Sequence, residues 1–501
     1  MILQPESFRA YIEQFNANDE EHYANAFPNA DALDFLRDNI PLFTCPDPVL
    51  ERTYYFRWWT YRKHLKQTPD GWVVTEFLPN VPWAGVHNTI CCPAGHHFYE
   101  GRWLRDSRYL AETARFWFRS GNPRLYSFWG ADAILAWARV SGDMALAVEL
   151  LPDLVANWEA WGRTHRPERD GLFIQSADRD GMEMSLSGDG VRPTINSYQY
   201  GDAKSIAEIA RYAGDTAAAE RFEAEARTLK ALVRERLWDP DARFFKTRPE
   251  GPGSPLASVR ELAGYVPWYF NLPDADCDDA WRQLTDPEGF AAPFGPAFAE
   301  QRCPQFQLNY SGHECQWNGP SWPFATAQTL TALANLLNSH GQDVIGKADY
   351  FDILRRYAAS HTRTREDGTV VPWIDENLHP HTGDWISRTR LKTCVNGTWS
   401  PEKGGVERGK DYNHSTFCDL VISGLVGLRP GADGRLLVNP LLPENTWDWF
   451  CLDRLNYRGL DVTVLWDRDG SRFGRGKGFR MFVNGRLTAH ADSLLRMEHP
   501  L

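Results

Sequence analysis

The chain has 501 residues, of which 43% are hydrophobic and 24% are charged. This length allows one large core with an appendage, or two to three domains of average size. The formal net charge of −12 disfavours a nucleic-acid or an anionic-membrane partner, because phosphate groups would be repelled.

The ends and the cysteines exclude several other classes. The N-terminal MILQPESFRAYIEQF has no basic region followed by an apolar run, and no segment approaches 18 uninterrupted apolar residues. We therefore predict a cytoplasmic protein with no membrane partner. The nine cysteines form no CxxC pair, and His96-His97 have no third ligand at metal-site spacing, so we expect no metal, no disulfide framework and no cofactor. The oligomeric state stays open.

Residues 1–45 mix helical and polar signals and are predicted to be a lead-in that packs on the rest. Apolar residues then recur at a spacing of three to four, which predicts amphipathic helices. Turn residues such as Gly142-Asp143 and Gly214-Asp215 separate them. Short and long connections alternate, which indicates stacked helical hairpins over 46–429. The predicted helices are 48–65, 103–118, 129–140, 145–161, 205–214, 217–238, 322–337, 350–359 and 417–428.

Four connections are longer than compact folds usually tolerate without a function, namely 70–101, 164–200, 286–320 and 362–411. They hold most of the segments rich in Trp, Asp and Glu. We expect them to gather at one end of the helical part and to form a cleft.

After residue 430 the pattern changes to an alternation of apolar and polar residues. Asp469-Gly470 and Asn484-Gly485 are tight-turn pairs within it. These features predict β-hairpins, and hence a small β domain over 430–501.

Aromatic residues make up 13% of the chain, including 21 Trp. A flat aromatic face with a hydrogen-bonding edge suits a sugar ring, but large helical cores also use Trp as filler. Composition alone leaves both interpretations open.

Two loop segments concentrate carboxylates beside Gly, Trp and Asn. Residues 176–185 contain Asp178, Asp180 and Glu183, and residues 372–383 contain Asp375 and Glu376. Hydrolysis of a glycosidic bond needs one acid to protonate the leaving oxygen and a second carboxylate to activate water or to attack. Considered alone, either segment also fits a solvated turn.

Three motifs carry a family resemblance. Gly181-Met-Glu-Met-Ser185 resembles the Gly-x-Asp-x-Ser segment that holds the general acid in glycoside hydrolase family 63, mannosylglycerate hydrolases and trehalases. Glu376-Asn-Leu-His-Pro-His-Thr-Gly383 resembles the Glu-Asn-Tyr-x-Pro-x-Thr-Gly segment that holds the general base in family 63. Trp317-Asn-Gly-Pro-Ser-Trp-Pro323 is similar to the Trp-x-Gly-Pro-x-Trp loop of that group. The resemblance implies a mainly α fold, an (α/α)6 barrel of helical hairpins with a small C-terminal β domain.

The resemblance also implies catalytic roles, with Glu183 as general acid and Glu376 as general base. Glu183 stands where the family usually has Asp, and Glu is one methylene longer. Asp180 and Asp178 are therefore the alternative acids.

Weaker matches suggest substrate-binding residues. Arg102-Trp-Leu-Arg-Asp106 loosely resembles a segment whose Asp holds sugar hydroxyls, although Arg and Asp at this spacing also form helix-surface ion pairs. The Trp residues can stack on sugar rings or belong to the core, and His414 can face the pocket or be structural. The predicted substrate-binding residues are Asp106, Arg102, Trp103, Trp317, Asn318, Trp322, Trp373 and His414, with Glu314 as a further hydrogen-bonding candidate.

We therefore expect an inverting exo-glycosidase that removes a terminal, α-linked sugar from a short oligosaccharide or glycoside. Inversion requires the two carboxyl groups to lie roughly 6.5–9.5 Å apart. One alternative is a phosphorylase, epimerase or lyase on the same barrel. The other is a non-catalytic carbohydrate-binding protein.

Overall fold

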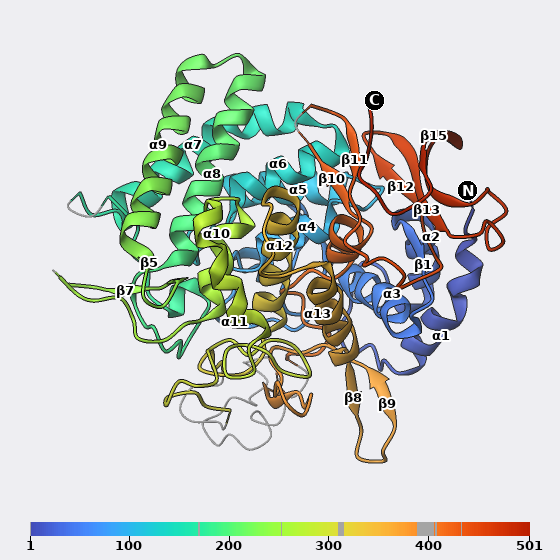
Figure 1. Ribbon diagram of the computed structural model, residues 1–501, viewed down its shortest axis with the longest axis horizontal. Helices are drawn as coiled ribbons and strands as arrows, with labels where there is room; N and C mark the ends of the chain where they lie inside the picture. Colours follow the sequence, from blue (N-terminus) through green and yellow to red (C-terminus); the bar gives the residue numbers. More distant parts are fainter. Residues whose placement is uncertain are drawn as a thin grey trace.

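The computed structural model describes residues 2–168, 171–251, 253–308, 315–387, 405, 408–431 and 433–501. Helices fill most of the molecule, and strands near the C-terminus lie beside the N-terminal segment (Figure 1). None of the described helices is both long and apolar enough to span a lipid bilayer. The α-helices are α1 (Arg9–Ala17), α2 (Ala32–Asn39), α3 (Pro48–Lys63), α4 (Ala94–Gly101), α5 (Arg108–Arg119), α6 (Gly130–Ser141), α7 (Met144–His165), α8 (Pro193–Ala213), α9 (Thr216–Leu237), α10 (Val266–Tyr269), α11 (Arg282–Thr285), α12 (Pro323–Ser339) and α13 (Lys347–Ser360).

An inner ring of helices surrounds the barrel axis. It runs through α4, α6, α8, α10 and α12 to the helical segment η8 (Leu420–Leu425), and each member contacts the next. The ring closes at Glu100 of α4, whose carboxylate accepts hydrogen bonds of 2.9–3.2 Å from the backbone N–H groups at the start of the η8 region. Helices α3, α5, α7, α9 and α13 form the second layer. The predicted barrel of helical hairpins is confirmed.

Local sequence signals account for several helix boundaries. Asp47, Asp143 and Asp215 accept hydrogen bonds from backbone N–H groups in the first turns of α3, α7 and α9. Gly142 and Gly214 end α6 and α8 in the left-handed conformation, at φ +81° and +78°. The predicted turns at both positions are confirmed.

Two inner helices differ from the prediction. Helix α8 begins at Pro193 instead of residue 205, and α4 lies where a loop was expected. Both helices are buried on nearly every side, so their sequences lack the one-sided apolar stripe of a surface helix. For the same reason the loops predicted at 70–101 and 164–200 are shorter than expected.

The strands form a β unit that also uses the N-terminal segment. A five-stranded sheet has the order β1-β12-β13-β14-β15, and a three-stranded sheet has the order β10-β11-β16. Strand β1 pairs antiparallel with β12, with Phe43 opposite Leu452, so the lead-in supplies an edge strand that the sequence did not predict. The Asn484-Gly485 turn between β14 and β15 is confirmed. The strands are β1 (Leu42–Thr44), β2 (Leu65–Thr68), β3 (Gly71–Val74), β4 (Gly190–Val191), β5 (Trp238–Asp239), β6 (Phe244–Phe245), β7 (Arg248–Pro249), β8 (Thr362–Thr364), β9 (Val370–Pro372), β10 (Leu428–Pro430), β11 (Leu436–Val438), β12 (Trp449–Tyr457), β13 (Leu460–Asp467), β14 (Gly478–Val483), β15 (Arg486–Ala491) and β16 (Met497–His499).

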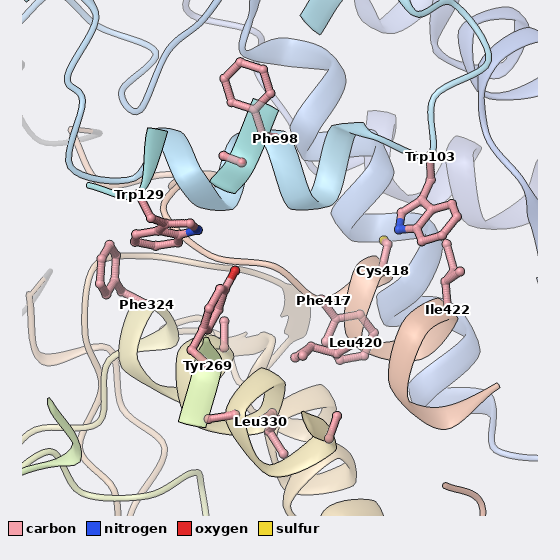
Figure 2. Packing of buried hydrophobic residues seen from close by; sticks show 14 of the residues in the cluster. Phe98, Trp103, Trp129, Tyr269, Phe324, Leu330, Phe417, Cys418, Leu420 and Ile422 are labelled. Atoms are coloured by element: carbon pink, nitrogen blue, oxygen red, sulfur yellow. The ribbon is translucent and has the colours of Figure 1, made fainter. Parts of the chain in front are cut away.

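Aromatic and aliphatic side chains from the inner ring meet inside the barrel (Figure 2). Trp129, just before α6, lies edge-on to Tyr269 of α10, with ring centroids 5.3 Å apart. Burying each such side chain contributes about 1.5–3 kcal/mol. Much of the high Trp content therefore serves the core. The fully buried Trp residues include Trp58, Trp59, Trp103, Trp117, Trp129, Trp137, Trp161, Trp268 and Trp281.

Candidate active site

Glu183 and Glu376 line the same pocket, which has a volume of about 230 Å³. It lies at the ends where the inner helices begin, and each of the four long connections supplies part of its wall, as expected from the sequence. The lining residues are Glu76, Phe77, Trp83, Ile90, Cys92, Tyr126, Asp178, Gly181, Glu183, Cys315, Trp317, Trp322, Phe324, Glu376, Arg408, Tyr412 and His414.

A constrained turn presents Glu183 to the pocket. Gly181 has φ +70°, and a Cβ atom there would lie 2.4 Å from Sγ of Cys92, so only glycine fits. Met184 also has a positive φ of +65°, which is uncommon for a non-glycine residue. The carbonyl oxygen of Glu183 accepts a 3.0 Å hydrogen bond from the backbone N–H of Trp317. The backbone around Glu183 is thus held on both sides.

The environment of Glu183 favours its neutral form. Burial raises the pKa of this carboxyl to about 8, and the negative charges of Asp178 and Glu376 act in the same direction. Glu183 therefore carries a proton at neutral pH, which is the form that a general acid needs.

Glu376 has a different environment. Its carboxylate lies 3.4 Å from Nε of Arg408, which stabilises a negative charge there. Its backbone N–H donates to Asp375 at 2.9 Å, and its carbonyl accepts a 3.1 Å hydrogen bond from Nε2 of His414. Burial lowers the pKa of His414 well below its usual value, so this imidazole is neutral. The buried Glu376 and the partly buried Glu183 thus meet in one pocket, in unequal electrostatic environments.

The two alternative acids have other surroundings. Asp180 is fully buried, lies 2.7 Å from Nε of Arg192 and accepts a hydrogen bond from Thr194. Within the described part of the chain it is not among the residues that line the pocket. Asp178 lies at the pocket wall, with 59% of its side chain exposed.

Three of the predicted substrate-binding residues line the pocket, namely Trp317, Trp322 and His414. The rings of Trp317 and Trp322 stack with centroids 3.9 Å apart and an interplanar angle of 7°. Trp373 and Asn318 are buried, but neither is among the described residues that line the pocket. Glu314 lies outside the described residues.

The structure does not bring the other three predicted residues to this pocket. Arg102 and Trp103 both donate to Oδ1 of Asp419, at 2.7 Å in the shortest contacts. Asp106 instead accepts hydrogen bonds from Arg108, two residues along the chain. Of the three, only Asp106 thus forms a short-range surface ion pair, whereas Arg102 and Trp103 make buried contacts to a segment far away in the chain.

Sequence reasoning missed four polar residues of the lining, namely Tyr126, Glu76, Arg408 and Tyr412. The last three lie in or next to a long connection, but none of the four belongs to a recognisable motif. The only available signal was a carboxylate in the first long loop with no basic neighbour in sequence.

Comparisons with known proteins agree with this geometry. Residues 86–415 match the model of the mannosylglycerate hydrolase MGH1-like glycoside hydrolase domain, and residues 428–489 match the C-terminal domain of glycosyl hydrolase family 65. The first match contains both Glu183 and Glu376.

Solved structures share the fold. A structure named "Sialidase" is 42% identical with a TM-score of 0.91, covering 99% of this chain but 45% of that one, so this chain spans less than half its length. The GH78 family rhamnosidase of Bacillus sp. GL1 is 14% identical with a TM-score of 0.54, covering 85% of this chain and 40% of that one. The GH63 mannosylglycerate hydrolase from Thermus thermophilus in complex with glucose is 12% identical with a TM-score of 0.50, covering 68% of this chain and 95% of that one. The last two show the fold alone.

The family match extends over more than half of the chain and includes Glu183 and Glu376. The chain belongs to the family of mannosylglycerate hydrolase MGH1-like glycoside hydrolase domains.

Proposed function

We propose that this protein hydrolyses the bond to a terminal sugar in a short oligosaccharide or glycoside, with inversion at the anomeric carbon. The observation that carries the proposal is the pairing of the Glu183 and Glu376 carboxyl groups in one pocket with unequal electrostatic environments. Unequal environments assign the acid and base roles of such a pair.

In this mechanism Glu183 donates its proton to the glycosidic oxygen as the bond to the anomeric carbon breaks. Glu376 accepts a proton from a water molecule whose oxygen attacks that carbon from the opposite face. Arg408 stabilises the negative charge of Glu376 before the reaction. Afterwards Glu183 is ionised and Glu376 is protonated, and one proton passes back through solvent.

The shape of the pocket supports cleavage at a chain end. Its volume of about 230 Å³ is below the roughly 300–1,000 Å³ of sites for drug-sized ligands, which suits one sugar residue. Aromatic rings on several sides offer flat faces to that ring. The α linkage is an expectation that rests on the family resemblance.

Phosphorolysis is a less suitable reaction for this pocket. A phosphate nucleophile needs a cluster of cationic or hydroxyl donors. The described lining instead carries the carboxyl groups of Glu76, Asp178, Glu183 and Glu376, with Arg408 already beside one of them. Asp178 and Glu376 supply the negative charge, which Arg408, the single cation among these described residues, offsets only in part, so phosphate would be repelled whereas water is neutral.

The test is a screen of α- and β-linked aryl glycosides and disaccharides, with NMR to identify the anomer released first. We expect inversion, and a loss of 10²–10⁴-fold or more in Glu376→Gln, the usual range for removing a general base. Glu183→Gln should lose much rate on alkyl glycosides but little on glycosyl fluorides, because fluoride leaves without a proton.

The exposed variant Glu149→Gln serves as the matched control. Absence of turnover by the folded protein would leave only sugar binding as a function. Full activity in Glu376→Gln, or release of the retained anomer, would contradict the assigned mechanism.

A further inference from the structure

A third carboxyl group, Glu76, lines the same pocket as Glu183 and Glu376. It follows strand β3 in the first long connection and is 7% exposed. Its backbone carbonyl accepts a 3.2 Å hydrogen bond from the N–H of Asn413, which fixes the main chain at this point. The side chain is therefore held at the pocket by the segment that also carries Tyr412 and His414.

The described part of the chain forms a hydrogen bond with only one of the two oxygens of the Glu76 carboxyl group. Oε1 accepts a hydrogen bond from the phenol of Tyr412. Among the described residues, Oε2 has no hydrogen-bond partner. It is also not one of the fully buried polar atoms without a partner, so it is accessible from the pocket. A buried polar group without a partner is costly, so an oxygen in this position is expected to bind a ligand or water.

Electrostatics determine the form in which Glu76 would act. Burial raises its pKa to about 8, and the charges of Glu376 and Glu183 act in the same direction. The other titratable groups that interact with it are Tyr412, Tyr126, Cys91 and Cys92, whose pKa values are all raised by burial, so they stay neutral. At neutral pH Glu76 is then a neutral acid that accepts at Oε1 and can donate at Oε2.

We propose that Glu76 binds a hydroxyl group of the sugar that lies between Glu183 and Glu376, with Tyr412 holding its carboxyl group in position. The inference rests on the proposed function, because it takes a sugar as the ligand of this pocket. A donor in a fixed place selects sugars with a hydroxyl at one ring position. Glu76 would thus determine specificity without itself transferring a proton to the glycosidic bond.

The test measures binding instead of turnover, so that catalysis does not enter the result. The probes are D-glucose, D-mannose, L-rhamnose and their monodeoxy derivatives, titrated by NMR into Glu376→Gln protein. Adding Glu76→Ala should weaken binding of the preferred sugar at least tenfold. Adding Glu76→Gln should change it only a few-fold, because an amide has the same donor and acceptor as a protonated carboxyl.

One deoxy derivative should distinguish a contact from a general distortion. The sugar that lacks the contacted hydroxyl should bind equally to proteins with and without the Glu76→Ala substitution, while the other derivatives keep the tenfold difference. Tyr412→Phe should give a smaller loss with the same positional pattern. Equal losses for every derivative, or no loss in Glu76→Ala, would overturn the inference, as would failure of all the sugars to bind.

A pH titration gives an independent readout. In a protein with both Glu183→Gln and Glu376→Gln, Glu76 is the member of the three that remains ionisable. Without those two charges the pKa of Glu76 should lie below about 8 but stay raised by burial, so sugar affinity should fall as the pH rises through that range and stay level when Glu76→Gln is added. Sugar binding with the positional pattern but without hydrolysis would contradict the proposed function and support the role of Glu76. Hydrolysis without the positional pattern would support the proposed function and contradict the role of Glu76.

Discussion

The carboxyl groups of Glu183 and Glu376 have very different electrostatic environments. The same burial that keeps Glu183 neutral would also act on Glu376, but Arg408 lies 3.4 Å from the latter. A cation at this distance offsets much of the desolvation cost of a charge. The placement of a single guanidinium thus separates a proton donor from a proton acceptor.

The pH dependence of the rate should report the protonation of Glu183. Its pKa is raised to about 8, so the protonated, active fraction falls above that pH and kcat/KM should decline by up to tenfold per unit. On a glycosyl fluoride, which needs no proton donor, this alkaline limb should shrink, and any decline that remains should disappear when Glu76→Gln is introduced. Measurement of kcat/KM from pH 5 to 10 on both substrate types checks this, and an alkaline limb of equal size on the fluoride would show that Glu183 does not cause it.

At the scale of elements, the loop that carries Glu183 is fastened to helix α8. The ion pair between Asp180 and Arg192 is fully buried and joins the turn to the residue before that helix. Ser185 and Ser187 donate to the buried carboxylate of Glu261, which fastens the other side of the loop. In the proposed mechanism Asp180 would thus position Glu183 instead of acting as the acid.

Asp180→Asn should mainly reduce stability. Breaking a buried ion pair by removing one partner costs about 3–5 kcal/mol, because the other charge stays buried without compensation. Chemical denaturation measures this loss, and Asp178→Asn at the exposed wall should cost less than about 1 kcal/mol, as for other surface charges. If Asp180→Asn keeps its stability but shows the leaving-group pattern expected of Glu183→Gln, Asp180 is the acid.

For the whole molecule, the Glu100 side chain contributes the main-chain hydrogen bonds that close the inner ring, beside the contacts of Arg102 and Trp103 with Asp419. Glu100 of α4 accepts hydrogen bonds from the N–H groups of Phe417, Cys418 and Asp419, and so joins the last inner segment to the first. The pocket lies at the end of this ring, with His414 and Tyr412 just ahead of the same segment. The shape of the site thus depends on the closure.

Glu100→Ala should destabilise the protein strongly. It leaves three buried donors without an acceptor, at about 1–3 kcal/mol each. Glu100→Gln keeps an acceptor oxygen and should lose less, and Glu149→Ala on the surface should change little. Thermal unfolding compares the three, and a loss below about 1 kcal/mol in Glu100→Ala would mean that the ring closes by other contacts.

The sequence predicted helices α7, α9 and α13 because each has one face toward the core and one toward water. The inner helices α6 and α12 are buried on nearly every side, but they are rich enough in Ala and Leu to be predicted as well. The similarly buried α4 and first half of α8 were not predicted, because glycine and polar residues interrupt their apolar pattern. Strand β1 also escaped prediction, because three residues are too few to show a period of two.

Glu183 and Glu376 were recognisable in the sequence because each lies within a motif whose spacing is local. Glu76, Tyr412 and Arg408 were not, since their roles arise only when segments far apart in the chain meet. The sequence by itself determined the helical hairpins and the C-terminal strands through local periodicity, and its local motifs carried the family resemblance that implied the barrel and the two candidate carboxyl groups. Only the tertiary structure decided which charges are buried together, and burial together is what sets the protonation of a carboxyl group.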